Sequence, residues 1–253
     1  MLEFLIGFVV AIIIALTGVG ASVVTAPLLI LFLKIPVDIA VSTTLAYSAI
    51  VKFIVVPFQV ARRQIDYRIL AIMLAGGVPG VIFGSVAFKH VATNGPKAAL
   101  SFALGAIIFF TAAWHLYRHF YPAALERANS STRSKWLLAA ITLPIGAEIG
   151  FSSAGAGALG TVALLGLTSL TATQVVGTDL AFGLVIAVVG SGVHLIGGHY
   201  NATLLIKLAA GGVVGGLIGS GVAPKIPNRN LRFVLSLWLL VIGIQFCYQA
   251  IMK

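Results

Sequence analysis

The stretch Thr17-Gly18-Val19-Gly20-Ala21-Ser22 interrupts a run of sequence that is otherwise apolar over residues 2–33. A second stretch, Ser152-Ser153-Ala154-Gly155-Ala156-Gly157-Ala158, interrupts the apolar run of residues 136–167 in the same way. Both stretches, called the first and second breaks below, are rich in small and hydroxyl-bearing residues and carry no full charge. Irregular backbone is tolerated at bilayer depth only where protein buries it or a polar cavity wets it. The two breaks therefore predict a binding site inside a membrane.

The composition predicts one polytopic membrane domain over residues 1–253. Hydrophobic residues make up 60% of the chain and charged residues 9%, whereas soluble domains carry about 25% charged residues. The net charge of +10 is assigned to basic loops on the cytoplasmic side rather than to a nucleic-acid surface. Cys247 has neither a second cysteine nor a nearby metal ligand, so no disulfide, metal or cofactor is expected. Glu3 stands where a signal peptide would be basic, so the first apolar run is expected to stay in the mature fold.

The apolar runs divide the chain into helical segments. A spanning helix needs roughly 20 residues, so residues 2–33 are too long for one pass and too short for two passes with a turn. Split at the first break, they fit a re-entrant hairpin or a broken helix. Further spans are predicted at residues 37–61, 67–88 and 98–117, with a polar loop at 89–97. The long polar segment 118–135 is interpreted as a cytoplasmic linker between repeat one (1–120) and repeat two (136–253).

The second half repeats the first at a constant offset. From 75 to 85, seven of eleven positions are identical to their counterparts at 210 to 220. Thr43-Thr44 aligns with Thr178-Asp179 at the same offset. At the breaks two alignments stay open, because an offset of 135 pairs Gly20 with Gly155, whereas 137 pairs Gly18 and Gly20 with Gly155 and Gly157.

Basic residues favour one of two topologies. If the first unit of each half crosses the membrane, the halves are parallel. Nine basic residues then lie on one side of the membrane and six on the other. If each first unit is a re-entrant hairpin, each half has three full passes and the halves are inverted. Ten basic residues then lie on one side of the membrane and five on the other. The second arrangement has the stronger positive-inside asymmetry, so inverted repeats with both termini outside are favoured. The ten residues of the cytoplasmic side are Arg62, Arg63, Arg68, Arg118, Arg127, Arg133, Lys135, Lys225, Arg229 and Arg232.

A helix that starts just after a break points its N-terminus into the membrane. Its free N–H groups and its dipole favour an anion there. The candidate donors are Gly18, Gly20, Ala21, Ser22 and Thr25 in the first half, and Ser152, Ser153, Gly155, Ala156 and Gly157 in the second. The alternative is that these glycines serve only close helix packing, which is also the interpretation preferred for the glycine faces at 76–84 and 211–219.

Four ordered features resemble the TauE/SafE sulfite exporter family. They are the run Gly18-Val19-Gly20-Ala21-Ser22 followed by Pro27, the hydroxyl-rich second span at Ser42-Thr43-Thr44, the double glycine of the third span, and the repetition of this pattern after a polar linker. The resemblance covers essentially the whole chain. It implies transport of small sulfur-containing anions, such as sulfite or organosulfonates, across the cytoplasmic membrane.

Ionisable groups inside spans are candidates for function. Lys52 lies about nine residues from Arg62, near mid-bilayer at about 1.5 Å per residue, and is expected to meet the anion or to pair with an acid; a lysine that extends to the interface is the alternative. Asp179, the repeat equivalent of Thr44, is expected to pair with Lys52, to carry a coupling proton or to cap backbone. Glu148, just before the second break, is the other proton-carrier candidate. Thr43, Thr44 and Thr178 complete the substrate-binding set, whereas His194 and His115 are expected near the ends of spans.

Three functions remain open at this point. Secondary transport of a small anion by alternating access, linked to protons, is the leading interpretation. A passive anion channel would use the same site. An intramembrane serine hydrolase is the remote alternative, because Gly150-Phe151-Ser152-Ser153-Ala154 half-resembles a nucleophile elbow, with His194 or His199 as the second member of a dyad. The expected partners are the small anion and the lipid bilayer; the oligomeric state is left open, with a homodimer among the alternatives.

Overall fold

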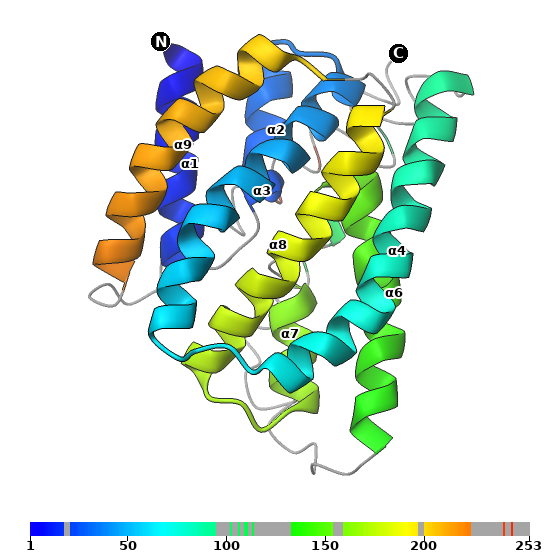
Figure 1. The fold of residues 1–253 in the computed structure, drawn as a ribbon. Helices are drawn as coiled ribbons and strands as arrows, with labels where there is room; N and C mark the ends of the chain where they lie inside the picture. The colour runs from blue at the N-terminus through cyan, green and yellow to red at the C-terminus, as the bar shows by residue number, and fades with distance from the viewer. Residues whose placement is uncertain are drawn as a thin grey trace.

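A computed structural model describes residues 1–17, 21–94, 133–153, 159–196 and 200–223, together with residues 102, 106, 109, 110, 113, 240 and 244. Every regular element of four residues or more within these ranges is an α-helix (Figure 1). Four helices come from the first half: α1 (Leu2–Thr17), α2 (Ala21–Phe32), α3 (Val37–Ala61) and α4 (Tyr67–Asn94). Four come from the second: α6 (Arg133–Ser152), α7 (Leu159–Leu167), α8 (Ala172–Ile196) and α9 (Ala202–Val222). The predicted span 98–117 falls largely outside the described residues, as do Gly18, Gly20, Gly155, Ala156 and Gly157.

The helix boundaries confirm one predicted span and correct two other boundaries. The span predicted at 37–61 is α3. The span predicted at 67–88 continues to Asn94, because Phe88 and Val91 pack with Val41 and hold one more turn of α4 in place. The linker predicted to end at 135 ends earlier, since α6 begins at Arg133. Polar residues are tolerated there because the first N–H groups of a helix face solvent.

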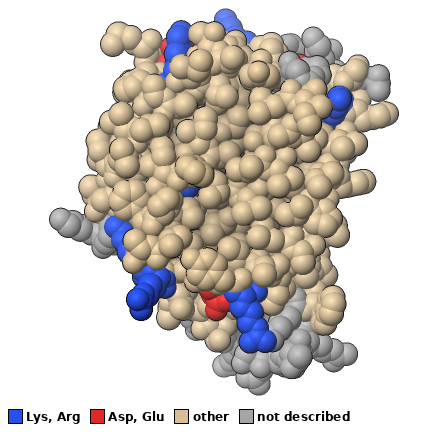
Figure 2. All heavy atoms as spheres, in the orientation of Figure 1, with Lys and Arg blue, Asp and Glu red and all other residues tan. Residues whose placement is uncertain are grey.

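The described helices form a multi-pass membrane protein. Helices α3, α4, α8 and α9 are each long and apolar enough to cross a bilayer. Large apolar side chains such as Phe53, Phe83 and Ile206 lie exposed on the outside, which suits a lipid-facing surface. Figure 2 shows the charged side chains gathered at the two ends of the molecule, with a band between them that is almost free of them.

The paired short helices form hairpins at opposite ends of the molecule. In Figure 1, α1 begins at the end where α2 finishes and α3 starts, whereas α6 begins at the end where α7 finishes and α8 starts. The two helices of each pair therefore form a hairpin that starts and finishes at the same end of the molecule. A re-entrant hairpin requires this arrangement.

The two halves interlock through their glycine faces. Helix α4 packs along α6, and α9 packs along α1 (Figure 1). A Cβ added at Gly76, Gly80 or Gly84 would collide with the backbone of α6, and one at Gly211 or Gly215 would collide with the backbone of α1. These glycines thus serve close helix packing, as expected.

Helix ends and contacts recur at the offset found in the sequence. Thr17 and Ser152 end equivalent helices, and Val37 and Ala172 begin equivalent helices, each pair separated by that same offset. The backbone N–H of Asp66 donates to Thr178 Oγ1 (3.0 Å), and that of Asn201, its counterpart in the second half, donates to Thr43 Oγ1 (3.3 Å). In Figure 1 the equivalent helices α3 and α8 run in opposite directions, as do α4 and α9.

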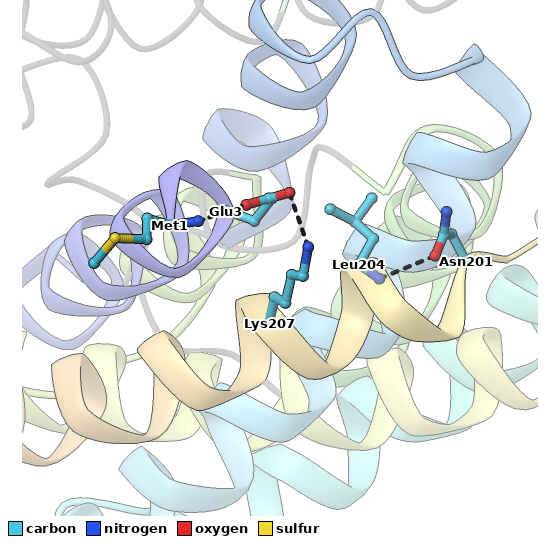
Figure 3. A network of polar contacts seen from close by, with 5 residues as sticks. All are labelled: Met1, Glu3, Asn201, Leu204 and Lys207. Carbon is cyan, nitrogen blue, oxygen red and sulfur yellow. Dashed lines mark hydrogen bonds and ion pairs between the residues drawn. The ribbon is translucent and has the colours of Figure 1, made fainter.

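The start of α9 shows how its N-terminus is held. The Asn201 side chain accepts from the Leu204 N–H at 2.9 Å and caps the helix, which satisfies one of the free N–H groups at its start (Figure 3). Lys207 then reaches Glu3 at 3.3 Å, and the N-terminal amine also contacts this carboxylate at 3.3 Å. Because this network is exposed, it ties α1 to α9 only weakly.

Candidate functional site

The centre of the molecule contains a buried lysine. Lys52 lies on α3 with 1% of its surface exposed, whereas its neighbour Phe53 is 71% exposed. The ammonium therefore points into the protein and does not extend to the interface. It lies against Gly183 of α8, where an added Cβ would fall well inside contact distance of Lys52 Nζ. A glycine at this position makes room for the charge.

Asp179 lies on α8, one helical turn before Gly183, so the packing of α3 on α8 brings its carboxylate near Lys52 from the opposite repeat. Its carboxylate is 2% exposed and accepts a hydrogen bond from Thr161 Oγ1 at 2.9 Å. The same carboxylate lies over Gly160, where a Cβ would collide with it. Gly160 and Thr161 belong to the first turn of α7, so Asp179 occupies a helix N-terminus, where an anion is favoured.

The sequence predicted an anion at the start of this helix but did not predict that the protein supplies one itself. Asp179 was expected to pair with Lys52, to carry a proton or to cap backbone. The structure brings it close to Lys52 and to the start of α7 at once. These relations depend on the packing of α3, α7 and α8, which residue spacing does not reveal.

A stripe of polar side chains runs along α3 next to the lysine. Thr44, Ser48 and Lys52 are four residues apart and so lie on one face of the helix. Thr44 and Ser48 are buried, and neither hydroxyl has a hydrogen-bond partner among the described residues. A buried hydroxyl left unpaired costs about 1–3 kcal/mol, so a ligand with oxygen acceptors would be stabilised here. Ser48 was missed from sequence; its spacing of four from both Thr44 and Lys52 was the available signal.

Ser153, the second residue of the second break, has a strained backbone conformation. Its φ of 61° lies in the left-handed region, which a residue with a Cβ adopts at a cost of about 1–2 kcal/mol. Its side chain is fully buried, and its hydroxyl has no hydrogen-bond partner within the described ranges. Strain of this kind is concentrated at functional sites. Ser152, in contrast, donates to the Glu148 carbonyl at 3.0 Å within its own helix.

The remaining candidates divide between structural contacts and positions near the breaks. Thr43 and Thr178 use their hydroxyls to accept the loop N–H groups of Asn201 and Asp66. Ala21 and Ser22 are the first two residues of α2, and Thr25 is fully buried one turn later. Glu148 is partly buried on α6, one turn before the second break.

His194 lies in the last turn of α8, near the end of a span as expected, but its side chain is buried. It is 6% exposed, with Nδ1 2.8 Å from Ser42 Oγ and Nε2 2.9 Å from the Gly150 carbonyl. Because a carbonyl only accepts, Nε2 carries the proton. The Ser42 hydroxyl also donates to the Asp38 carbonyl at 3.0 Å. Phe88 packs against the ring with centroids 4.9 Å apart. His194 therefore links α8 to α3, α4 and α6.

The serine that His194 contacts is Ser42, which is not part of the Ser–His dyad suggested by the sequence. The ring nitrogens of His194 meet Ser42 and Gly150, while Ser152 donates to a backbone carbonyl. His199 lies outside the described residues. Across the described ranges, no three His, Cys, Asp or Glu side chains are grouped to hold a metal.

Together, the spanning helices and their buried charged centre define a membrane protein of the transporter class. The chain belongs to the sulfite exporter TauE/SafE family, which it matches over residues 3–246. This confirms the family that the sequence motifs resemble.

Three proteins of Bacillus subtilis (strain 168) are similar along nearly their whole length. The probable membrane transporter protein YjnA is 29% identical over 247 residues, covering 95% of this chain and 97% of that protein. The probable membrane transporter proteins YdhB and YunE are each 24% identical, covering 96% and 94% of this chain and 98% and 93% of their own. No solved structure matches the chain.

Proposed function

We propose that this protein moves a small sulfur-containing anion, sulfite or an organosulfonate, across the cytoplasmic membrane by alternating access. The observation that carries the proposal is the buried Lys52 ammonium, aligned with the hydroxyls of Thr44 and Ser48, which have no partner in the described part of the chain. A lysine at bilayer depth is costly and marks a substrate or ion pathway. An oxygen-rich anion satisfies both the charge and the hydroxyls.

The substrate class follows from family membership and from the chemistry of the site. The family is named for sulfite export, and sulfite and sulfonates present several acceptor oxygens on one small anionic group. Ammonium and hydroxyl groups both donate hydrogen bonds to such oxygens. In this proposal Ser22, Thr25 and Ser153 add donors from the two breaks to Thr44, Ser48 and Lys52.

Alternating access is the proposed mechanism, and the arrangement of the two halves supports it. The equivalent helices run in opposite directions, and each hairpin enters from its own end of the molecule (Figure 1). Inverted repeats with a site at their interface are a recurrent plan of secondary transporters. We propose the same membrane topology here, with basic loops in the cytoplasm and both termini outside, whether the protein works as a monomer or as a homodimer.

Flux into proteoliposomes tests the proposal. Purified protein is reconstituted, and uptake of sulfite, methanesulfonate and acetate is measured against empty liposomes. Saturable uptake of a sulfur-containing anion, accelerated by the same anion on the opposite side, is the expected result. Uptake that rises linearly with concentration and shows no such acceleration would indicate the passive channel. Absence of uptake of both sulfur-containing anions would contradict the proposal.

A further inference from the structure

The two most deeply buried charges of the described residues cancel each other. Lys52 is 1% exposed and Asp179 is 2% exposed, and they belong to different repeats. These two buried charges therefore contribute no net charge to the seam between α3 and α8 before a ligand enters. This neutrality has a consequence for any anion that binds there.

Each of the two groups is held in place by something other than its partner. The Asp179 carboxylate is fixed to the start of α7 by Thr161 and by its close approach to Gly160. The Lys52 ammonium lies against Gly183, one helical turn along α8 from Asp179. A ligand can therefore become the counter-ion of Lys52 while Asp179 stays attached to α7.

An incoming anion leaves the seam with two negative charges and one positive charge. Two like charges about 4 Å apart repel by about 4 kcal/mol at the effective dielectric constant of a protein. Burying an uncompensated charge adds a further cost. A proton that enters with the anion removes both costs, and the carboxyl that has just lost its ammonium partner is where it binds.

We propose that one proton accompanies each anion and that Asp179 carries it, a step that rests on the proposed function. On the entry side the anion binds Lys52, and a proton from solvent binds the Asp179 carboxyl; the ammonium keeps its three protons. On the exit side the anion leaves, Asp179 returns its proton to solvent, and the Lys52–Asp179 pair forms again. Charge is conserved at each stage.

Few titratable groups among the described residues surround this carboxyl. Lys52 approaches from α3, and from α7 come the Thr161 hydroxyl and Gly160. On α8 itself, Gly183 is one turn away. Glu148, on α6 before the second break, is partly buried and is the other acid predicted to carry the proton. It provides the matched comparison.

The test counts protons and anions in the same proteoliposomes. Methanesulfonate is the first probe because it stays ionised at all working pH values, so any proton moved with it is carried by the protein. Sulfite at mildly acidic pH on both sides of the membrane, where it is the monoanion bisulfite, is the second probe. The wild type is expected to move one proton per anion, read from an internal pH dye and labelled substrate. Transport of either anion without proton movement would overturn the inference, whereas no transport of either contradicts the proposed function instead.

Variants then assign the proton to a residue. Asp179→Asn is expected to exchange anion for anion at equal concentrations but to move no protons, because the amide is always neutral. Asp179→Glu is expected to restore proton movement, and Glu148→Gln to leave it intact. Proton movement that persists in Asp179→Asn, or disappears in Glu148→Gln, would overturn the assignment. The proton count of the wild type stands as a test even where a variant fails to fold.

Discussion

At the scale of single residues, Gly183 leaves the space that the Lys52 ammonium occupies. An added Cβ would meet Lys52 Nζ, which is the far end of a flexible side chain, and not backbone. The Gly183→Ala protein is therefore expected to fold, with the ammonium displaced from its place. We predict about a tenfold loss of anion affinity, equivalent to about 1.4 kcal/mol, measured as the half-saturating concentration of uptake.

Gly192 provides the control for this substitution on the same helix. An added Cβ there would meet nothing within 4 Å, so Gly192→Ala is expected to behave as the wild type. Equal affinities in Gly183→Ala and the wild type would show that the position of the ammonium does not matter for binding.

At Ser153, the contribution of the hydroxyl to anion binding can be tested separately from that of the left-handed backbone. Glycine adopts the left-handed φ found at this position without steric cost, so Ser153→Gly removes the hydroxyl and keeps the break. A hydrogen bond to a charged group contributes about 1.5–3 kcal/mol, so anion affinity is expected to fall at least about tenfold while thermal stability is kept or raised. Ser191→Ala is the control, because that hydroxyl donates to the Val188 carbonyl in its own helix. Unchanged affinity in Ser153→Gly would remove Ser153 from the site.

The sequence identifies the residues of the buried charged site, but it does not predict which of them contact each other. Lys52 and Asp179 are conspicuous because charge is rare inside apolar spans. Ser48 is inconspicuous, because a single serine is common in such helices. Its spacing from Thr44 and Lys52 is the sign in the sequence, and the structure adds that its hydroxyl has no partner within the described part of the fold. The position of Asp179 at the start of α7 is a tertiary contact between segments that no local pattern joins.

At the scale of elements, His194 holds three helices at one end of the bundle. Replacing it with leucine removes its hydrogen bonds to Ser42 and Gly150. The buried Gly150 carbonyl then lacks the hydrogen bond that His194 donates. We predict a loss of about 2–4 kcal/mol, from two buried hydrogen bonds, seen as a lower melting temperature of the protein in detergent. His194→Gln, which keeps a donor, is expected to lose less. Equal melting temperatures for the leucine variant and the wild type would contradict this role.

Helix boundaries were predictable where the sequence contains a residue that disfavours an apolar helix. Pro36 precedes α3, and Arg62 follows it, so both ends could be read from residues that disfavour continued apolar helix. The end of α4 could not, because its last turn is held by the packing of Phe88 against Val41. The burial of His194 was missed for the same reason: distance from a helix end along the chain does not measure depth in a bundle.

At the scale of the whole molecule, the proposed inverted topology predicts where each segment faces. A reporter enzyme active only in the cytoplasm is expected to be inactive when fused after Lys253 and active when inserted between residues 120 and 130. Immunodetection of both fusions controls for expression. The opposite pattern, or activity at both positions, would contradict two inverted sets of three passes.

The central claim is that the buried ammonium of Lys52 binds the transported anion. Its most direct test is counterflow of labelled sulfite in proteoliposomes that contain Lys52→Met, with Lys207→Met as the control. Lys207 is exposed and contacts only Glu3 among the described charged side chains, so its loss is expected to leave counterflow unchanged. Saturable counterflow is expected to fall to the level of empty liposomes in Lys52→Met while the protein remains folded. Counterflow by Lys52→Met with the affinity and rate of the wild type would contradict it.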